Sequence, residues 1–193
     1  MKTLLTLFVL LFSSCALTED ISDYQIEGIS VGDSLLNIFT LEQIKSHEES
    51  YYKDYEYIPV YFTDIIPLKE YQGIQFHYKF GDSKFKIEAI EGVLFFENMP
   101  DRCFDKMEEV NYDIEKIFQN FEKKETGIIP HEQDPSGRSK YSSFYYELKN
   151  GNIIIGCVNW HQSMKDEYNL IDNFRFAIYT SEFQDWIDYI AYN

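Results

Sequence analysis

The sequence has few arginines, a large excess of acidic residues and few cysteines. Only Arg102, Arg138 and Arg175 are arginine among its 193 residues, and 33 acidic residues against 17 basic ones give a net charge of −16. Phosphate binding needs clustered Lys and Arg, so this balance argues against nucleic acid and against docking on an anionic membrane surface. A cationic partner is electrostatically allowed, although the acidity also serves to keep a chain with 16 Phe and 16 Tyr soluble.

The common motifs of catalysis and cofactor binding are also absent. The sequence contains no HExxH, no GxSxG, no P-loop and no GxGxxG. Its four histidines do not stand at the spacings typical of zinc sites. We therefore predict neither a metal nor a cofactor, and the pattern favours a protein that is not an enzyme.

The amino terminus has the pattern of an export signal. An apolar run from Leu4 to Phe12 is too short to span a bilayer and leads into small residues ending at Ala16. This predicts a signal peptide over residues 1–16 and a single mature domain over 17–193. Lipoprotein processing, with a lipid anchor at Cys15, is the alternative. Either route predicts a periplasmic or secreted protein without an integral membrane span.

Two cysteines remain after either route of processing, Cys103 and Cys157. An even number of cysteines in an oxidising compartment predicts one disulfide between them. Two alternatives stay open at this point. The two thiols could be buried separately, or Cys103 could be reactive because it lies near the start of a predicted helix, where its pKa would fall.

The clearest secondary-structure signal is a β-hairpin within residues 71–97. Apolar and polar residues alternate before a Gly81-Asp82-Ser83 turn, and the alternation resumes after it. Period-two alternation places one set on each face, which predicts a half-buried antiparallel pair with His77 facing solvent. The alternation changes phase near Ala89-Ile90, which predicts a β-bulge there.

Capping, turn and periodicity signals predict the other elements. They comprise helices starting at Ser30 and Thr40, an edge strand over 57–63, a helix from Pro100 to about Phe121, a long loop over 122–139, strands over 144–148, 153–160 and 170–180 with a turn at Asn150-Gly151, a loop over 161–169, and a helix from Ser181.

The order of these elements predicts an α+β fold. Helix, strand, strand, strand occurs over 30–97 and again over 100–180, and a C-terminal helix follows. Antiparallel strands that are grouped together, and do not alternate with helices, favour α+β over a parallel α/β sheet. Because the two stretches share little sequence, their likeness is a hypothesis about topology.

The best candidates for a functional patch lie in and near the predicted 122–139 loop. His131, Asp134 and Arg138 stand within it, and His161 follows the strand that ends at Trp160. Loops often carry functional residues, and an arginine can orient an anion or a carboxylate. The alternative interpretation is an ordinary polar surface loop.

Two short stretches carry resemblances. IEGISVGDSLL, residues 26–36, resembles uncharacterised secreted proteins encoded in marine alphaproteobacterial genomes. Gly28-Ile29-Ser30 before a three-stranded meander is similar to small envelope modules, namely outer-membrane assembly lipoproteins of the SmpA/OmlA type and the β-lactamase-inhibitory-protein-like fold. Neither resemblance implies an activity or a site residue.

Together these observations predict a non-catalytic, exported binding module. Its partner would be an envelope protein or a small ligand. One alternative is an inhibitor or immunity-like protein whose acidic surface blocks a basic enzyme. The other is a hydrolase that uses His131 and Asp134, with His161 beside them.

Overall fold

The computed structural model describes residues 20–64, 67–97, 99–117 and 121–192, and it confirms the predicted α+β class. The predicted signal peptide and the anchor residue Cys15 lie outside these residues. The α-helices are α1 Leu41–Ser46, α2 Pro100–Ile117, α3 Gln162–Tyr168 and α4 Ser181–Tyr189, and the short 3-10 helices are η1 Ile21–Asp23 and η2 Leu35–Asn37. Strands β1 Gln25–Ile26 and β2 Ile29–Ser30 form a small hairpin.

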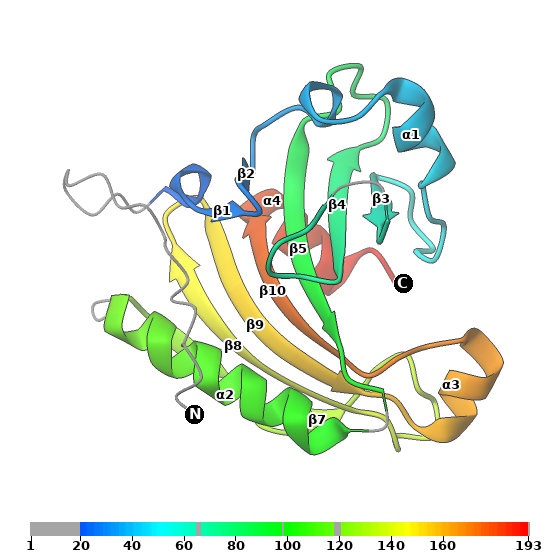
Figure 1. Cartoon of the computed structure of the whole chain (residues 1–193), viewed down its shortest axis with the longest axis vertical. Helices are drawn as coiled ribbons and strands as arrows, with labels where there is room; N and C mark the ends of the chain where they lie inside the picture. The colour runs from blue at the N-terminus through cyan, green and yellow to red at the C-terminus, as the bar shows by residue number, and fades with distance from the viewer. Residues whose placement is uncertain (1–19, 65–66, 98, 118–120, 193) are drawn as a thin grey trace.

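The main sheet is antiparallel and has eight strands. Its order is β3-β4-β5-β10-β9-β8-β6, and β7 also pairs with β8. The strands are β3 Tyr57–Phe62, β4 Gly73–Lys79, β5 Ile87–Phe95, β6 Lys123–Glu125, β7 Ile129–Pro130, β8 Lys140–Leu148, β9 Gly151–Asn159 and β10 Asn173–Thr180. Two three-stranded meanders, β3-β4-β5 and β8-β9-β10, therefore lie side by side through the pairing of β5 with β10 (Figure 1).

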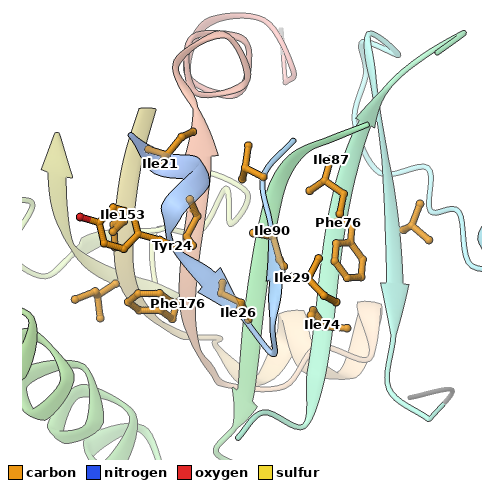
Figure 2. Close-up of a cluster of buried hydrophobic side chains, with 14 of the residues drawn as sticks. Ile21, Tyr24, Ile26, Ile29, Ile74, Phe76, Ile87, Ile90, Ile153 and Phe176 are labelled. Carbon is orange, nitrogen blue, oxygen red and sulfur yellow. The ribbon is translucent and has the colours of Figure 1, made fainter. Parts of the chain in front are cut away.

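One face of this sheet, the α2 face, carries the main apolar core. On β10 it presents Phe174, Phe176 and Ile178, and α2 covers it with Cys103, Met107 and Ile114. The predicted disulfide is confirmed, with Cys103 of α2 and Cys157 of β9 joined at 2.04 Å. Figure 2 shows the β1-β2 hairpin adding its isoleucines to the same core. The α2 face is thus covered along its length by apolar segments.

The opposite face, the α4 face, is different in character. It presents Arg175, Ala177 and Tyr179 of β10, because successive side chains alternate across a strand. Figure 1 shows α4 on the side of the sheet away from α2. A separate, smaller apolar cluster forms where α4 meets this face, and it includes Tyr52, Tyr57, Ala89, Phe183 and Trp186. Part of the α4 face remains uncovered.

Several predicted boundaries are confirmed and others are wrong. Thr40 and Gln43 form the predicted capping box of α1. The predicted helix at Ser30 is wrong, because Ser30 ends β2 and its N–H donates to the Asp33 carboxylate at 3.0 Å in a turn. The predicted loop over 122–139 contains β6 and β7, and the predicted loop over 161–169 contains α3.

The β8-β9 turn and the cap of α4 each lie one residue before their predicted positions. Leu148 pairs with Gly151, so the turn residues of that hairpin are Lys149 and Asn150. A Cβ on Gly151 would overlap the carbonyl oxygen of Tyr179, so glycine is needed there for close strand packing. The capping side chain of α4 is that of Thr180 instead of Ser181.

The bulge in the β4-β5 hairpin is present close to its predicted place. His77 pairs with Ala89 whereas Tyr78 pairs with Ile87, so Glu88 is the additional residue. The insertion keeps Phe76 and Ile87 in the apolar core while His77 and Glu91 lie on the α4 face.

Candidate functional site

An ion pair between Glu91 and Arg175 occupies the middle of the α4 face. Nη1 of Arg175 donates to Oε2 of Glu91 at 2.5 Å, and the hydroxyl of Tyr179 donates to Oε1 at 2.7 Å. Nε of Arg175 donates to Oδ1 of Asn173 at 3.0 Å, and Nη1 is also 3.4 Å from Oε1 of Gln75. The guanidinium plane is thereby held from several directions.

The two partners of this ion pair differ in exposure. The Glu91 side chain is 3% exposed, whereas that of Arg175 is 40% exposed. Burial alone would raise the pKa of Glu91, but the charge of Arg175 and the hydrogen bond from Tyr179 outweigh it and lower that pKa. Burial and the nearby Glu91 raise the pKa of Tyr179 well above its usual value. Near neutral pH the cluster is a carboxylate, a guanidinium and a protonated phenol.

His77 lies beside the ion pair, and the prediction that it faces solvent is wrong. Its side chain is fully buried, and Phe183 of α4 lies against it with ring centroids 4.5 Å apart. Its Nε2 is 2.9 Å from the hydroxyl of Tyr52 and 3.1 Å from Nε2 of Gln75. Among the described residues its Nδ1 has no hydrogen-bond partner, although it is 4.0 Å from Oε1 of Glu91.

The surroundings of His77 keep it neutral. Burial lowers its pKa to about 4, Glu91 opposes that change and Arg175 adds to it. A neutral, enclosed imidazole without access to solvent packs the face and fixes Gln75, and it does not exchange protons readily with a ligand at neutral pH.

A cavity of about 150 Å³ opens beside Arg175 on the α4 face. It lies between α4 and strands β8, β9 and β10, and its lining residues are Tyr141, Tyr145, Ile154, Gly156, Val158, Arg175, Ala177, Tyr179, Gln184, Ile187 and Asp188. The floor is small and apolar, three tyrosines stand around it, and polar groups come from β10 and α4. A wider hollow of about 540 Å³ adjoins it and shares Tyr145, Gln184 and Asp188.

The α4 side of the cavity supplies hydrogen-bond acceptors. Nε2 of Gln184 donates to Oδ1 of Asp188 at 2.9 Å. Oε1 of Gln184 is buried and, within the described part of the chain, has no hydrogen-bond partner. Asp188 stands at the exposed rim, where partial burial raises its pKa above the usual value. The cavity therefore has a guanidinium on one side and oxygen acceptors on the other.

Asp134 of the predicted patch anchors its own loop. Its carboxylate accepts from the backbone N–H and the hydroxyl of Ser136 and from those of Ser139, at 2.6 to 2.8 Å. These hydrogen bonds hold its pKa well below the usual range. Arg138 is exposed and its Nε donates to the hydroxyl of Ser136 at 3.1 Å. Neither side chain lines the cavity.

His131 is the member of the predicted patch that lies nearest the cavity. Its ring packs on Trp160 at 4.3 Å between centroids and lies 6.0 Å from the ring of Tyr141, a cavity residue. Burial lowers its pKa to about 4, the charge of Arg175 contributes, and Asp134 opposes the change. Nδ1 of His131 accepts from the N–H of Gln133 at 3.2 Å.

His161 caps a helix. Its Nδ1 accepts from the N–H of Ser163 at the start of α3, and its own N–H donates to the hydroxyl of Ser139 at 3.0 Å. The structure thus gathers His131, Asp134 and His161 around Ser139, with Asp134 and His161 turned towards backbone amides. No cluster of side chains suited to a metal ion occurs in the described ranges.

The ion pair itself was not predicted from the sequence. A signal for it was present, because Glu91 and Arg175 are the single charges within the largely apolar stretches IEGVLFF and NFRFAIY. A charge at such a position is rarely buried unless it is paired. What the sequence did not provide was the pairing of β5 with β10, which brings the two residues together.

Comparison with known proteins assigns no family. No family model matches the chain, and no curated protein or solved structure matches it. Among the residues that the structure describes, no helix combines the length and apolar character needed to cross a membrane.

Proposed function

We propose that this chain is an exported, non-catalytic binding module that holds a small ligand with a carboxylate or similar oxyanion group against Arg175. The observation that carries the proposal is that the Arg175 side chain is held in place and yet remains partly exposed beside the cavity. Arg175 is fixed by Glu91 and Asn173, lines the cavity and is 40% exposed. The hydrogen bonds that its side chain donates to described residues come from Nε and Nη1, which leaves Nη2 for a ligand. A fixed, partly open guanidinium is preorganised for a planar oxyanion.

The arrangement of the titratable groups supports binding more than catalysis. The enclosed His77 is neutral, Tyr179 keeps its proton near neutral pH, and the Asp134 oxygens are engaged by serine donors. General acid–base catalysis needs a group that exchanges a proton within reach of the substrate. None of these three side chains is placed to do so.

Export is supported by the signal-peptide pattern and by the Cys103–Cys157 disulfide, since structural disulfides persist in oxidising compartments. The chain expressed with residues 1–16 should be recovered in the periplasm or medium and begin after Ala16, as read by intact mass. A mature chain that begins with a lipid-modified Cys15 would support the anchored alternative, and unprocessed cytosolic protein would contradict export.

The binding proposal is tested by titrating the protein with a panel of small carboxylic and amino acids. The readouts are NMR signals from the Arg175 guanidinium and from tyrosine rings of the cavity. We expect saturable shifts with at least one member. The effect should disappear in Ala177→Leu, which fills the floor of the cavity, and should persist in Ser142→Ala, a change on the α2 face of β8. Unchanged spectra throughout the panel would contradict the proposal.

A further inference from the structure

Gln184 gives the cavity a second polar requirement, opposite in kind to that of Arg175. Its Nε2 donates to the Asp188 carboxylate, which fixes the amide orientation, because the flipped amide would place two oxygen acceptors against each other. Gln184 as a whole is 8% exposed, and its Oε1 has no hydrogen-bond partner in the described residues. A buried acceptor of this kind calls for a donor from water or from a ligand.

The balance of charge around the cavity points in the same direction. Arg175 and Glu91 are in contact and largely cancel each other, whereas Asp188 adds a negative charge at the rim. A ligand with only a carboxylate would therefore enter a site without net positive charge, in a protein of net charge −16. A ligand that also carries an ammonium removes this penalty, because Gln184 and Asp188 offer it oxygen acceptors.

The tyrosines favour the same ligand. Tyr141, Tyr145 and Tyr179 stand around the cavity, and the faces of aromatic rings attract cations. The hydroxyls of Tyr141 and Tyr145 are 3.2 Å apart, which sets the two rings relative to each other. The cavity volume of about 150 Å³ is similar to that of an engineered protein cavity that binds one benzene molecule. The ligand should therefore have roughly six to ten non-hydrogen atoms.

From these features we infer that the cavity binds a small zwitterion, with its carboxylate on Arg175 and its ammonium between Gln184 and Asp188. The inference rests on the proposed function and names the class of its ligand. Arg175 supplies a fixed donor fork, and the α4 residues supply the acceptors that a carboxylate cannot use. A free amino acid or an ω-amino acid of suitable length has this chemistry.

The test compares two zwitterions with their singly charged analogues by calorimetry at neutral pH. One set is 5-aminopentanoate, pentanoate and pentylamine. The other is L-leucine, 4-methylpentanoate and 3-methylbutylamine. We expect at least one zwitterion to bind tenfold or more tightly than both of its analogues. Asp188→Asn should remove most of that preference, because it removes the carboxylate proposed to accept from the ammonium. Asp185→Asn is the matched control and should keep the preference. It makes the same change of charge on α4, but Asp185 does not line this cavity.

The outcomes separate this inference from the proposed function. If pentanoate or 4-methylpentanoate binds as tightly as its zwitterion, and Ala177→Leu abolishes the binding, the inference of a zwitterionic ligand is wrong. The proposed carboxylate-binding function is supported by that result. If pentylamine or 3-methylbutylamine binds as tightly as its zwitterion, and the Glu91→Leu/Arg175→Met variant keeps that affinity, Arg175 does not hold the ligand. Both the proposed function and the zwitterion inference are then wrong about Arg175. If none of the six compounds binds, the inference fails, and the wider acid panel decides the proposed function.

Discussion

The two faces of the main sheet differ in polarity and in how completely they are covered. The α2 face is apolar along its length, is covered by α2, α1 and the β1-β2 hairpin, and carries the disulfide. The α4 face buries Gln75, His77 and Glu91 and leaves a cavity beside Arg175. Because successive strand residues alternate between the faces, one set of strands supports both.

This division has an energetic consequence. Apolar burial on the α2 face stabilises the fold without directional requirements. A polar cluster in a low-dielectric setting depends on every partner being present, because an orphaned buried charge is costly. The α2 face should therefore tolerate changes of shape in proportion to the volume lost, whereas the α4 face should respond to loss of a single partner and recover when both partners are removed.

The largest effect on stability should come from removing the Cys103–Cys157 disulfide on the α2 face. The bridge closes a loop with a sequence separation of 54, for which chain entropy gives about 4 kcal/mol of stabilisation. We expect Cys103→Ala/Cys157→Ala to lower the free energy of unfolding by about this amount in urea titrations. Reduced wild-type protein is the matched control and should show a similar loss.

Ligand binding distinguishes the faces in the same experiment. At low denaturant the cysteine-free variant should bind any compound that the wild type is found to bind in the proposed titrations, because Cys103 and Cys157 lie on the other side of the sheet from Arg175. Loss of binding in a variant that remains folded would contradict the separation of the two faces.

A smaller effect should follow from breaking the ion pair on the α4 face. Arg175→Met leaves the buried Glu91 carboxylate without its cation, and since Arg175 is partly exposed we expect a loss of about 3 kcal/mol, at the lower end for buried pairs. Glu91→Leu/Arg175→Met should restore stability to within about 1 kcal/mol of the wild type, because apolar replacements of both partners remove the penalty.

The full double-mutant cycle, measured by urea denaturation at neutral pH, checks this expectation. Additive losses in the double variant would show that the two residues act independently and would remove the contrast with the α2 face. The double variant should also lack affinity for carboxylates, which separates the stability of this face from its binding capacity.

The sequence was sufficient to predict the two faces but not what covers them. Alternation around Phe76 correctly placed His77 on the face opposite the core. Its burial depends on Tyr52 and Phe183, which are brought over it from distant parts of the chain. A period-two pattern reports which way a side chain points within a strand, and it contains no information about a helix that packs there later.

The candidate site shows the same limit more strongly. Glu91 and Arg175 are 84 residues apart, and only the pairing of β5 with β10 makes them partners. Asp134 of the predicted patch does not line the cavity, and the reason is local. Asp134 is followed by Ser136 and Ser139, which satisfy its carboxylate within the loop, and short-range pairings of this kind are common structural devices in turns.

The smallest of these effects concerns pH and again belongs to the α4 face. Burial lowers the pKa of His77 to about 4 in the folded protein, against 6.5 for an ordinary histidine. Between these values the unfolded chain binds the additional proton, so this contribution is complete above pH 6.5 and is lost as the pH falls towards 4. Lowering the pH from 7.5 to 5 should cost about 2 kcal/mol through this group alone.

Urea denaturation of His77→Gln at the two pH values isolates this contribution, because the variant should lose about 2 kcal/mol less than the wild type between them. His131, whose pKa is also lowered to about 4, remains in both proteins and supplies a common background. His47→Gln, a histidine beside Phe62 on the α2 side, is the matched control. An unchanged pH dependence in His77→Gln would mean that the imidazole is hydrated and that the α4 face is less well sealed than its packing indicates.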